Sequence, residues 1–325
     1  MISPKKILIT SGDHDGIGFE VSAKALKSLG PQSGVLPILY LKSGALTRFE
    51  NKLLSGLQKK FAISSFTTLT TALREKNTSA RDLFLIRSSL PPAKWVEESA
   101  QACLGGRAQA MATAPLSKPE IQNSGMSDLG HTDILKRVCG RKSAYMCFLG
   151  AKFNVILASG HVPVQDIPAS LSIESLVSCL TALSPLLKIL PANIRGRPLG
   201  ILGLNPHAGD QGLIGDFEKN QLGSLLSKMR SQKIKFDGPL VPDVAFQPQN
   251  WKKYSIYMAM YHDQGLIPFK VVHGFESGVH LTLGLPIWRT SVDHGTAKDI
   301  YGTNKANPNS MKEALIWAMR LARSK

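Results

Sequence analysis

The sequence has little of what marks several large classes of protein. Its 325 residues include four cysteines, Cys103, Cys139, Cys147 and Cys179, which form no C-x-x-C pair. Such dispersed cysteines are typical of buried free thiols, and they argue against a disulfide framework or a zinc knuckle. No apolar run approaches the roughly 18 residues that a membrane span requires. The start "MISPKKILIT" lacks the long apolar stretch of a signal peptide, so we expect a cytoplasmic protein with no membrane partner.

The chain is basic, with 39 lysines and arginines against 23 acidic residues and a formal net charge of +16. A charge of this size occurs in many proteins that bind nucleic acid. Here the basic residues are spread along the whole chain, and aromatic residues, which could stack on bases, make up only 7%. We therefore expect no nucleic-acid partner. The charge is instead suited to attract anionic substrates to a cleft.

Short apolar runs rich in β-forming residues recur along the chain. They occupy residues 5–10, 35–41, 83–87, 108–113, 144–149, 154–158, 198–204, 255–260 and 279–284. Several are apolar almost throughout, which is typical of strands covered on both faces. Helical patterns lie between many of them, for example at 18–30, 172–190 and 217–232. This alternation predicts an α/β fold with a largely parallel sheet, and the length predicts about two domains.

Two local motifs make specific predictions about the expected helices. Pro185 lies inside the pattern at 172–190 and should kink or split a helix there. Ser310 and Glu313 match the S-x-x-E capping box, which predicts a helix that starts just after Ser310.

Three histidines share one setting. His161, His207 and His262 each follow an apolar run and precede a glycine or proline break, in "ILASGHVP", "LGLNPHAG" and "MAMYHDQG". Polar residues after the strands of an α/β sheet often form ligand sites, and imidazole is the commonest neutral metal ligand. The pattern is typical of a divalent metal site with an open position. The alternative is that each histidine caps its own strand end, and no short metal motif decides between the two.

A second set of residues is suited to bind an anion. In "GHTDIL", His131 and Thr132 come at the expected start of a helix, where backbone N–H groups and the helix dipole favour phosphate. Lys270 ends "GLIPFK", and Arg289 follows the apolar "LPIW". A buried arginine usually has a carboxylate or phosphate partner, because burying its charge alone is costly. We expect a phosphate site; an internal salt bridge of Arg289 is the alternative.

Two stretches have the glycine and polar residues of a nucleotide site. The stretch 9–20, "ITSGDHDGIGFE", reads as a strand, a turn and a helix start, but its glycine spacing does not match G-x-G-x-x-G. The stretch 291–310, "SVDHGTAKDIYGTNKANPNS", is a long polar loop that contains His294 and Asp299. A carboxylate at such a position can bind a ribose diol. The alternative is a surface loop without a ligand.

Taken together, the motifs resemble those of the 4-hydroxythreonine-4-phosphate dehydrogenase family. The resemblance covers the chain from residue 5 to the C-terminus. It is carried by "TSGDHDGIGFE", "ATAPLSK", "GHTDIL", "GHVPVQDIPASLS", "GLNPHAGDQGLIG", "GPLVPDVAFQP", "MAMYHDQGLIPFK" and "GLPIWRTSVDHGTA". The loop "HGTAKDIYGTNKANP" is also similar to the nucleotide loop of the broader isocitrate and isopropylmalate dehydrogenase fold.

The resemblance implies two α/β/α domains with a cleft between them, as in isocitrate and isopropylmalate dehydrogenases. We expect a discontinuous domain with the nucleotide loop at 1–125 plus 275–325, and a metal and dimerisation domain at 126–274. It also implies a homodimer with the active site at or near the interface between the two chains.

The resemblance further implies an activity. Chains of this family oxidise 4-phosphooxy-L-threonine to 2-amino-3-oxo-4-phosphooxybutanoate, which decarboxylates to 3-amino-2-oxopropyl phosphate in pyridoxine 5'-phosphate biosynthesis. The oxidation depends on NAD or NADP and on one divalent metal ion, which can be zinc, magnesium, cobalt or manganese.

The roles of single residues follow from the same resemblance. The implied metal ligands are His161, His207 and His262, and the implied substrate contacts are His131, Thr132, Lys270, His280 and Arg289. The implied cofactor segment contains His294, Gly295, Ala297, Asp299 and Asn307. The general base is open among Asp243, Asp263 and Lys270.

Some positions depart from the family pattern. His280 stands where the family usually has an asparagine that touches substrate, and the usual "GDPAGIGPE" reads "GDHDGIGFE" here, with His14 and Asp15. The change at His280 bears on substrate identity more than on the type of reaction. A dehydrogenase of a phosphorylated four-carbon sugar acid, such as threonate or erythronate 4-phosphate, is therefore an alternative. A metal-dependent lyase or hydrolase without NAD is a more distant one.

Overall fold

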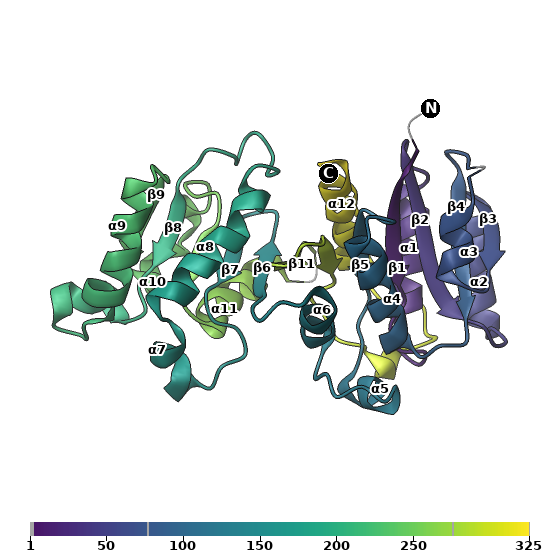
Figure 1. The fold of residues 1–325 in the computed structure, drawn as a ribbon, viewed down its shortest axis with the longest axis horizontal. Coiled ribbons are helices and arrows are strands. Elements are labelled where there is room, and N and C mark those ends of the chain that lie inside the picture. Colours follow the sequence, from purple (N-terminus) through teal and green to yellow (C-terminus); the bar gives the residue numbers. More distant parts are fainter. Residues whose placement is uncertain (1–2, 77, 275, 325) are drawn as a thin grey trace. The chain divides into compact units, whose positions relative to one another are not determined.

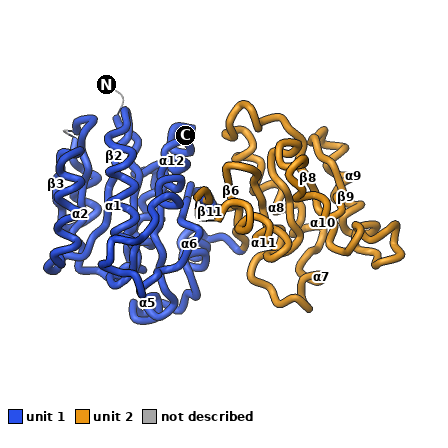
Figure 2. The backbone as a smooth tube through the Cα atoms, turned by 180° about the vertical axis from the view of Figure 1, so that it is seen from behind, with its two compact units in different colours: residues 1–142, 279–281, 285–325 blue, residues 143–278, 282–284 orange. Residues whose placement is uncertain are grey.

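The computed structural model describes residues 3–76, 78–274 and 276–324 (Figure 1). They form two compact units, drawn in different colours in Figure 2. Unit 1 spans Met1–Lys142, Val279–Leu281 and Leu285–Lys325, and unit 2 spans Ser143–Gly278 and Thr282–Gly284. The division into domains 1–125 plus 275–325 and 126–274 stays a prediction, and its boundary residue 275 lies outside the described residues.

Unit 1 is built on a sheet with the strand order β3-β4-β2-β1-β5-β12, next to which comes the β11 segment Val279–Leu281. The pairs of β1 with β2 and β5, of β4 with β2 and β3, and of β5 with β12 are all parallel. The strands are β1 (Lys5–Thr10), β2 (Val35–Lys42), β3 (Ala62–Phe66), β4 (Asp82–Ser88), β5 (Ala110–Thr113), β11 (Val279–Leu283) and β12 (Arg289–Ser291). The helices are α1 (Gly18–Leu29), α2 (Arg48–Gln58), α3 (Leu69–Arg74), α4 (Pro92–Leu104), α5 (Lys118–Asn123), α6 (His131–Cys139), η5 (Lys298–Ile300) and α12 (Asn309–Arg323).

Helices cover both faces of this sheet. Neighbouring residues of a strand point to opposite faces. Leu8 of β1 belongs to a buried cluster with Trp95 of α4 and Ile134 of α6. Its neighbour Ile7 lines a small apolar cavity together with Leu315 of α12. Burial of each such side chain contributes about 1.5–3 kcal/mol, so the three layers follow from strands that are apolar on both faces.

Unit 2 contains a second part of the sheet, with the strand order β6-β7-β10-β8-β9. The pairs β7–β10, β10–β8 and β8–β9 are parallel, and β6–β7 is antiparallel. The strands are β6 (Tyr145–Leu149), β7 (Asn154–Leu157), β8 (Leu199–Leu202), β9 (Phe236–Leu240) and β10 (Tyr257–Ala259). The helices are η1 (Val164–Asp166), α7 (Ile167–Ser170), α8 (Ile173–Leu187), η2 (Pro206–Gly212), η3 (Glu218–Leu222), α9 (Gly223–Ser231), α10 (Pro242–Ala245), η4 (Pro248–Asn250) and α11 (His262–His273).

Helix α11 packs directly on β7 and β10. Its residue Gly265 makes this close approach possible, since a Cβ atom there would lie 2.6 Å from Cγ1 of Val155. Leu266 and Phe269 extend the contact into the apolar cluster of unit 2. This packing fixes the start of α11, where His262 and Asp263 lie.

The predicted α/β class is confirmed, and most of its elements lie where the pattern placed them. The expected helix at 18–30 is α1, and the one at 172–190 is α8. Pro185 lies within α8 without splitting it. Because Thr181 and Pro185 are both exposed, water can satisfy the Thr181 carbonyl that the proline leaves without an N–H donor.

The predicted capping box at Ser310 is wrong. Helix α12 starts at Asn309, with Pro308 as its N-cap and no hydrogen bond from a capping side chain. The Ser310 hydroxyl instead accepts a hydrogen bond of 3.0 Å from the backbone N–H of Asp293. It therefore anchors the start of the loop 294–307 to the helix.

No single helix in the described part of the chain is long and apolar enough to span a membrane. The segments Val164–Ser170 and Ile173–Leu187 reach that length and composition only as a pair bent by 83°.

Candidate active site

The three histidines singled out in the sequence follow three neighbouring strands of unit 2. His161 comes after β7, His262 after β10 and His207 after β8, and these strands lie side by side in the order β7-β10-β8. Since the three strands are parallel, their carboxyl ends lie at the same edge of the sheet. This is the edge at which α/β folds bind ligands.

Two of these histidines lie close together. The ring centroids of His161 and His262 are 5.3 Å apart. Nδ1 of His262 lies 2.7 Å from Oδ1 of Asp263, which leaves Nε2 of His262 as the nitrogen suited to a metal ion. A carboxylate on the second ring nitrogen is the usual partner of a metal-bound histidine.

His207 lies on an unusual turn. Residues 207–211 all have positive φ, and His207 itself has φ 53° and ψ 24°. Non-glycine residues adopt this conformation at a cost of about 1–2 kcal/mol each, so something must hold the turn. The buried carboxylate of Glu218 accepts hydrogen bonds from the backbone N–H groups of Leu204 and Asn205, at 2.8 and 2.7 Å, and from the Asn205 side chain at 2.9 Å.

The structure thus brings two of the three predicted ligands together and places the third on the turn after the adjacent strand. Within the described ranges of one chain, no group of three His, Cys, Asp or Glu side chains is close enough to hold a metal ion. The donor chemistry nevertheless fits such an ion, because imidazoles at one sheet edge include a ring that a carboxylate orients. The metal site stays a prediction.

The candidates for the general base are exposed residues of unit 2. Asp243 lies in the first turn of α10. Asp263 and Lys270 both lie on α11, and seven residues are about two turns of an α-helix. Their side chains therefore project from the same side of α11, and Asp263 also contacts the ring of His262 at the helix start.

Two of the predicted anion-binding residues of unit 1, Arg289 and His280, are in contact. Arg289 on β12 is 3% exposed. Its Nε and Nη2 donate to Oγ1 of Thr113 on β5, at 3.1 and 2.7 Å, and its Nη1 donates to Nδ1 of His280 on β11 at 3.2 Å. Burial lowers the pKa of Arg289 to about 9, so the group still carries its charge at neutral pH.

His131 and Thr132 open helix α6, as predicted. The helix starts after Gly130, which supplies no capping side chain, so N–H groups of the first turn remain available for an anion. Nε2 of His131 is buried and has no hydrogen-bond partner among the described residues. Burial, with a smaller contribution from the charge of Arg289, lowers the pKa of His131 well below 6.5. The ring is therefore neutral and lies within the electrostatic influence of the Arg289 guanidinium.

The predicted cofactor segment, residues 294–307, is tied to the first part of the chain. The backbone N–H of Ile17 donates to the Thr296 carbonyl at 3.0 Å, and that of Ala306 donates to Oε1 of Glu20 at 3.0 Å. The Tyr301 hydroxyl donates to Oε1 of Glu50 at 3.1 Å. The glycine-rich stretch 12–18 therefore supports this loop, even though its spacing did not match a dinucleotide motif.

Several predicted cofactor residues have a geometry that fits a ligand. Nδ1 of His294 lies 2.9 Å from the Gly295 carbonyl, and its Nε2 is buried with no hydrogen-bond partner in the described part of the chain. Ala297 has φ 42°, which turns the chain just before Asp299. Asp299 and Asn307 are exposed. Among the residues that the structure describes, this loop thus has an unpaired ring nitrogen at His294 and an exposed carboxylate at Asp299.

Comparison with known proteins decides the family. The family model described as pyridoxal phosphate biosynthetic protein PdxA matches residues 89–318. Over 322 residues, the chain is 36% identical to the 4-hydroxythreonine-4-phosphate dehydrogenase of Sulfurihydrogenibium sp. (strain YO3AOP1), and the match covers 98% of each chain. The chain belongs to the PdxA family. This confirms the family that the sequence motifs indicated.

Solved structures agree with this assignment. The 4-hydroxythreonine-4-phosphate dehydrogenase from Klebsiella pneumoniae superposes with a TM-score of 0.77 at 26% identity, covering 98% of both chains. A β-decarboxylating dehydrogenase from Thermococcus kodakarensis superposes with a TM-score of 0.53 at 12% identity, covering 97% of this chain and 83% of that one. The second match shows the fold alone, and it supports the predicted likeness to isocitrate and isopropylmalate dehydrogenases.

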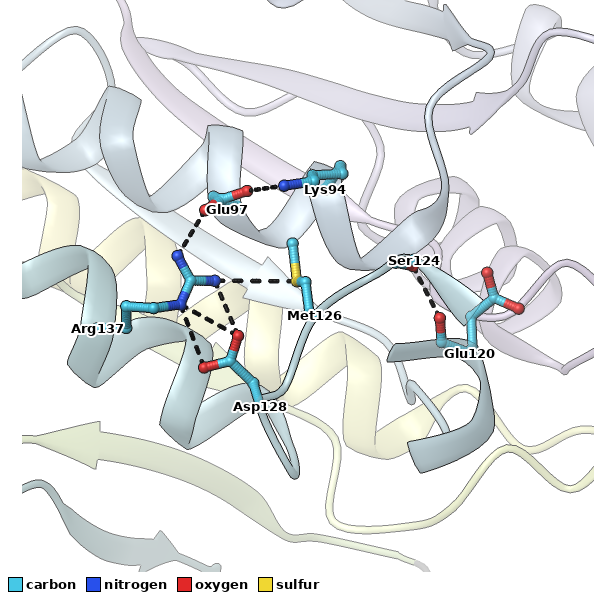
Figure 3. Close-up of polar contacts among 7 residues, drawn as sticks. All are labelled: Lys94, Glu97, Glu120, Ser124, Met126, Asp128 and Arg137. Atoms are coloured by element: carbon cyan, nitrogen blue, oxygen red, sulfur yellow. Dashed lines mark hydrogen bonds and ion pairs between the residues drawn. The ribbon is translucent and has the colours of Figure 1, made fainter. Parts of the chain in front are cut away.

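The structure of this PdxA-family chain also reveals residues that the sequence did not single out. Arg137 on α6 binds both oxygens of Asp128, its closest contact being 2.8 Å, and Nη1 donates to Oε1 of Glu97 on α4 at 2.7 Å (Figure 3). Asp128 lies just before Gly130, so this pair holds the loop that leads into His131. Arg137 is half-exposed, and no local motif distinguishes it from the other arginines of the chain.

Proposed function

We propose that this chain oxidises 4-phosphooxy-L-threonine to 2-amino-3-oxo-4-phosphooxybutanoate, which then loses CO2 to give 3-amino-2-oxopropyl phosphate. The observation that carries the proposal is the anion-binding group around Arg289 in a chain whose full-length relatives are 4-hydroxythreonine-4-phosphate dehydrogenases. A buried guanidinium and a helix N-terminus together are suited to a phosphate group. Lys270 is the further substrate contact that we assign.

We assign the cofactor to the loop with His294, Gly295, Ala297, Asp299 and Asn307. The chemistry that NAD supplies when bound is acceptance of the hydride from the carbinol carbon. The exposed carboxylate of Asp299 can accept hydrogen bonds from a ribose diol, whereas it would repel a 2'-phosphate. This favours NAD over NADP.

We assign the divalent metal ion to His161, His207 and His262. The chemistry that zinc, cobalt, manganese or magnesium supplies when bound is Lewis acidity, which lowers the pKa of an oxygen ligand. Asp263 orients the His262 ring through the 2.7 Å contact at Nδ1. Glu218 stabilises the turn that presents His207.

The oxidation also releases the proton of the carbinol hydroxyl, and the chain must supply its acceptor. Asp263 and Lys270 lie on one side of α11, where Asp263 contacts His262, and Asp243 lies on the short helix α10. We favour Asp263, because of the three candidates it is the one in contact with a proposed metal ligand, at 2.7 Å from Nδ1 of His262. Lys270 then pairs with the negative substrate.

We further propose that the chain forms a homodimer through unit 2. Val164, Leu213 and Val271 are 81, 85 and 79% exposed, and Ile267 lies one turn from Val271 on α11. Exposed large apolar side chains are typical of an interface. Since Leu213 lies next to the His207 turn, a second chain would come close to the metal ligands. Light scattering coupled to gel filtration measures the oligomeric state.

NADH absorbance tests the proposed reaction. We expect NADH formation with 4-phosphooxy-L-threonine and NAD, little with NADP, and loss of activity with a metal chelator that is reversed by added metal ion. Turnover that survives exhaustive chelation would contradict the assignment of a catalytic metal ion. Absence of turnover with every phosphorylated substrate would contradict the proposed oxidation.

One observation favours a second candidate substrate. His280, rather than the asparagine usual in the family, contacts Arg289 in the anion-binding group. Threonate 4-phosphate and erythronate 4-phosphate carry a hydroxyl in place of the amine and offer the same phosphate. The ratio of kcat/KM for these acids to that for 4-phosphooxy-L-threonine decides between the candidates.

A further inference from the structure

Three side chains of unit 1, Thr113, Arg289 and His280, are linked by hydrogen bonds across adjacent strands. We call this set the relay, with no transfer of a proton implied. The strands β5, β12 and β11 are neighbours in the sheet, and they contribute Thr113, Arg289 and His280 in that order. Oγ1 of Thr113 accepts from both Nε and Nη2 of Arg289, while Nη1 donates to Nδ1 of His280. Two N–H groups of the guanidinium thus converge on one hydroxyl oxygen, which favours this orientation of the group.

The relay determines which nitrogen of His280 carries the proton. A guanidinium has only donors, so Nδ1 of His280 must accept. The Ser291 hydroxyl lies 3.4 Å from the same nitrogen, but it donates to the Val292 carbonyl at 2.9 Å. The neutral ring therefore has its proton on Nε2. A protonated ring could not accept from Arg289, and it would bring a second positive charge to within 3.2 Å of the guanidinium.

We propose that Thr113 is a positioning residue of the phosphate site: it orients Arg289, and through Arg289 it holds His280 as an N–H donor at Nε2. The inference rests on the proposed function insofar as the bound anion is the substrate phosphate. It also explains how a histidine can stand where the family usually has asparagine. An asparagine amide offers an N–H donor by rotation, whereas a histidine offers one only in the tautomer that the relay selects.

A substitution of Thr113 by valine tests the relay with little change in shape. Thr113 is fully buried, and valine has nearly the same volume but no acceptor for the guanidinium. We expect Thr113→Val to raise KM for the phosphorylated substrate, and the inhibition constant of inorganic phosphate, by about tenfold or more, the effect of one hydrogen bond to a charged group. We expect kcat to change by less than about threefold, because the hydride donor carbon is not at this end of the substrate.

Two controls separate positioning from structure. Thr113→Ser keeps the hydroxyl and should restore KM to near the wild-type value. Thr290→Val removes another fully buried hydroxyl, whose contacts are to the Ala314 and Met111 carbonyls and not to Arg289. It should lower the melting temperature about as much as Thr113→Val does while leaving KM unchanged. Equal KM values in both valine variants and the wild type would overturn the role of Thr113.

The tautomer of His280 can be measured in the wild-type chain without any turnover. Nitrogen NMR of protein with ¹⁵N-labelled histidine, with the His280 signals assigned by their loss in His280→Asn, should show Nδ1 unprotonated and Nε2 protonated. A proton on Nδ1 would overturn the relay even if no Thr113 variant folds. Failure of the proposed reaction gives a different result, in which no substrate is oxidised but Nδ1 of His280 is unprotonated and Nε2 is protonated, as predicted.

Discussion

Nζ of Lys298 lies 2.7 Å from Oδ1 of Asp15 and 3.1 Å from Oδ2 of Asp13. Asp13 is buried, and its Oδ1 accepts from the Ser117 backbone N–H at 2.9 Å. The lysine therefore joins the proposed cofactor loop to the turn after β1, and its hydrogen bond to Asp15 raises the pKa of Lys298. Asp15 is one of the residues at which this chain departs from the family motif. The ion pair between Lys298 and Asp15 is therefore a feature of this chain and not of the usual motif.

Removal of this link should weaken cofactor binding. We expect Lys298→Met to raise KM for NAD by about three- to fivefold, because the exposed pair with Asp15 contributes at most about 1 kcal/mol and the loop has other anchors. KM for the phosphorylated substrate should stay unchanged. Lys305→Met, which removes an exposed lysine from the same loop, is the matched control. A similar effect of both variants would indicate general attraction of the nucleotide by positive charge.

The carboxylate of Glu218 should be essential for the His207 turn. Glu218→Ala removes three hydrogen bonds to the Leu204–Asn205 segment, and we expect it to lower the free energy of unfolding by about 2–4 kcal/mol. It should also reduce the metal content of the purified protein, since His207 is no longer held. Urea denaturation and elemental analysis measure the two effects.

Glu174→Gln is the control for Glu218, because Glu174 is an exposed acidic residue of the same unit. It should leave both quantities near their wild-type values. A Glu218→Ala variant with full metal content would show that the turn does not depend on this carboxylate.

The sequence predicted those features of the fold and the site that depend on interactions between residues close together in the chain. Helix α1 and the strands β7, β8 and β10 were predictable, because apolar periodicity is a local signal that tertiary packing reinforces. The position of His161, His207 and His262 after the ends of strands was predictable for the same reason. Their common sheet edge, however, required the order β7-β10-β8, in which the last strand along the chain lies in the middle.

Apolar periodicity could not predict contacts between residues that are far apart in the sequence. The bond between Arg289 and Thr113 joins positions 176 residues apart. Thr113 belongs to the motif "ATAPLSK", but nothing in that motif indicates an arginine partner. Ser310 illustrates the opposite error. Its S-x-x-E pattern fits a capping box, but its hydroxyl bonds to Asp293, a residue from the preceding loop. A capping motif predicts a helix start only where no tertiary partner competes for the hydroxyl.

His131 should make the stability of the chain depend on pH. The folded chain holds its ring neutral, because burial and then Arg289 lower its pKa well below 6.5. The unfolded chain takes up a proton near pH 6.5. The stability that the neutral ring contributes is therefore fully present above this pH and is lost as the pH falls below it, by at most about 1.4 kcal/mol per pH unit.

Comparison of wild type with His131→Gln isolates this contribution. Denaturant unfolding between pH 7.5 and 5 should give a steeper loss of stability for the wild type, with the two curves diverging as the pH decreases. Parallel curves would mean that His131 is protonated in the folded chain. In that case the anion-binding group would contain a second cation rather than a neutral N–H donor.

His262 should be the residue on which metal binding depends most directly. Its ring lies 5.3 Å from that of His161, and Asp263 orients it. We expect His262→Ala to lose the bound metal ion and NADH formation while its melting temperature stays close to that of the metal-free wild type, because His262 lies partly exposed at the first position of α11. Asp263→Asn should keep the His262 ligand but orient it poorly, which typically lowers the metal affinity by about 10–100-fold.

The control is His14→Ala, because His14 is an exposed histidine of unit 1. This variant should bind as much metal ion as the wild type does. One equivalent of metal in purified His262→Ala, bound as tightly as in the wild type by calorimetric titration, would contradict the ligand assignment.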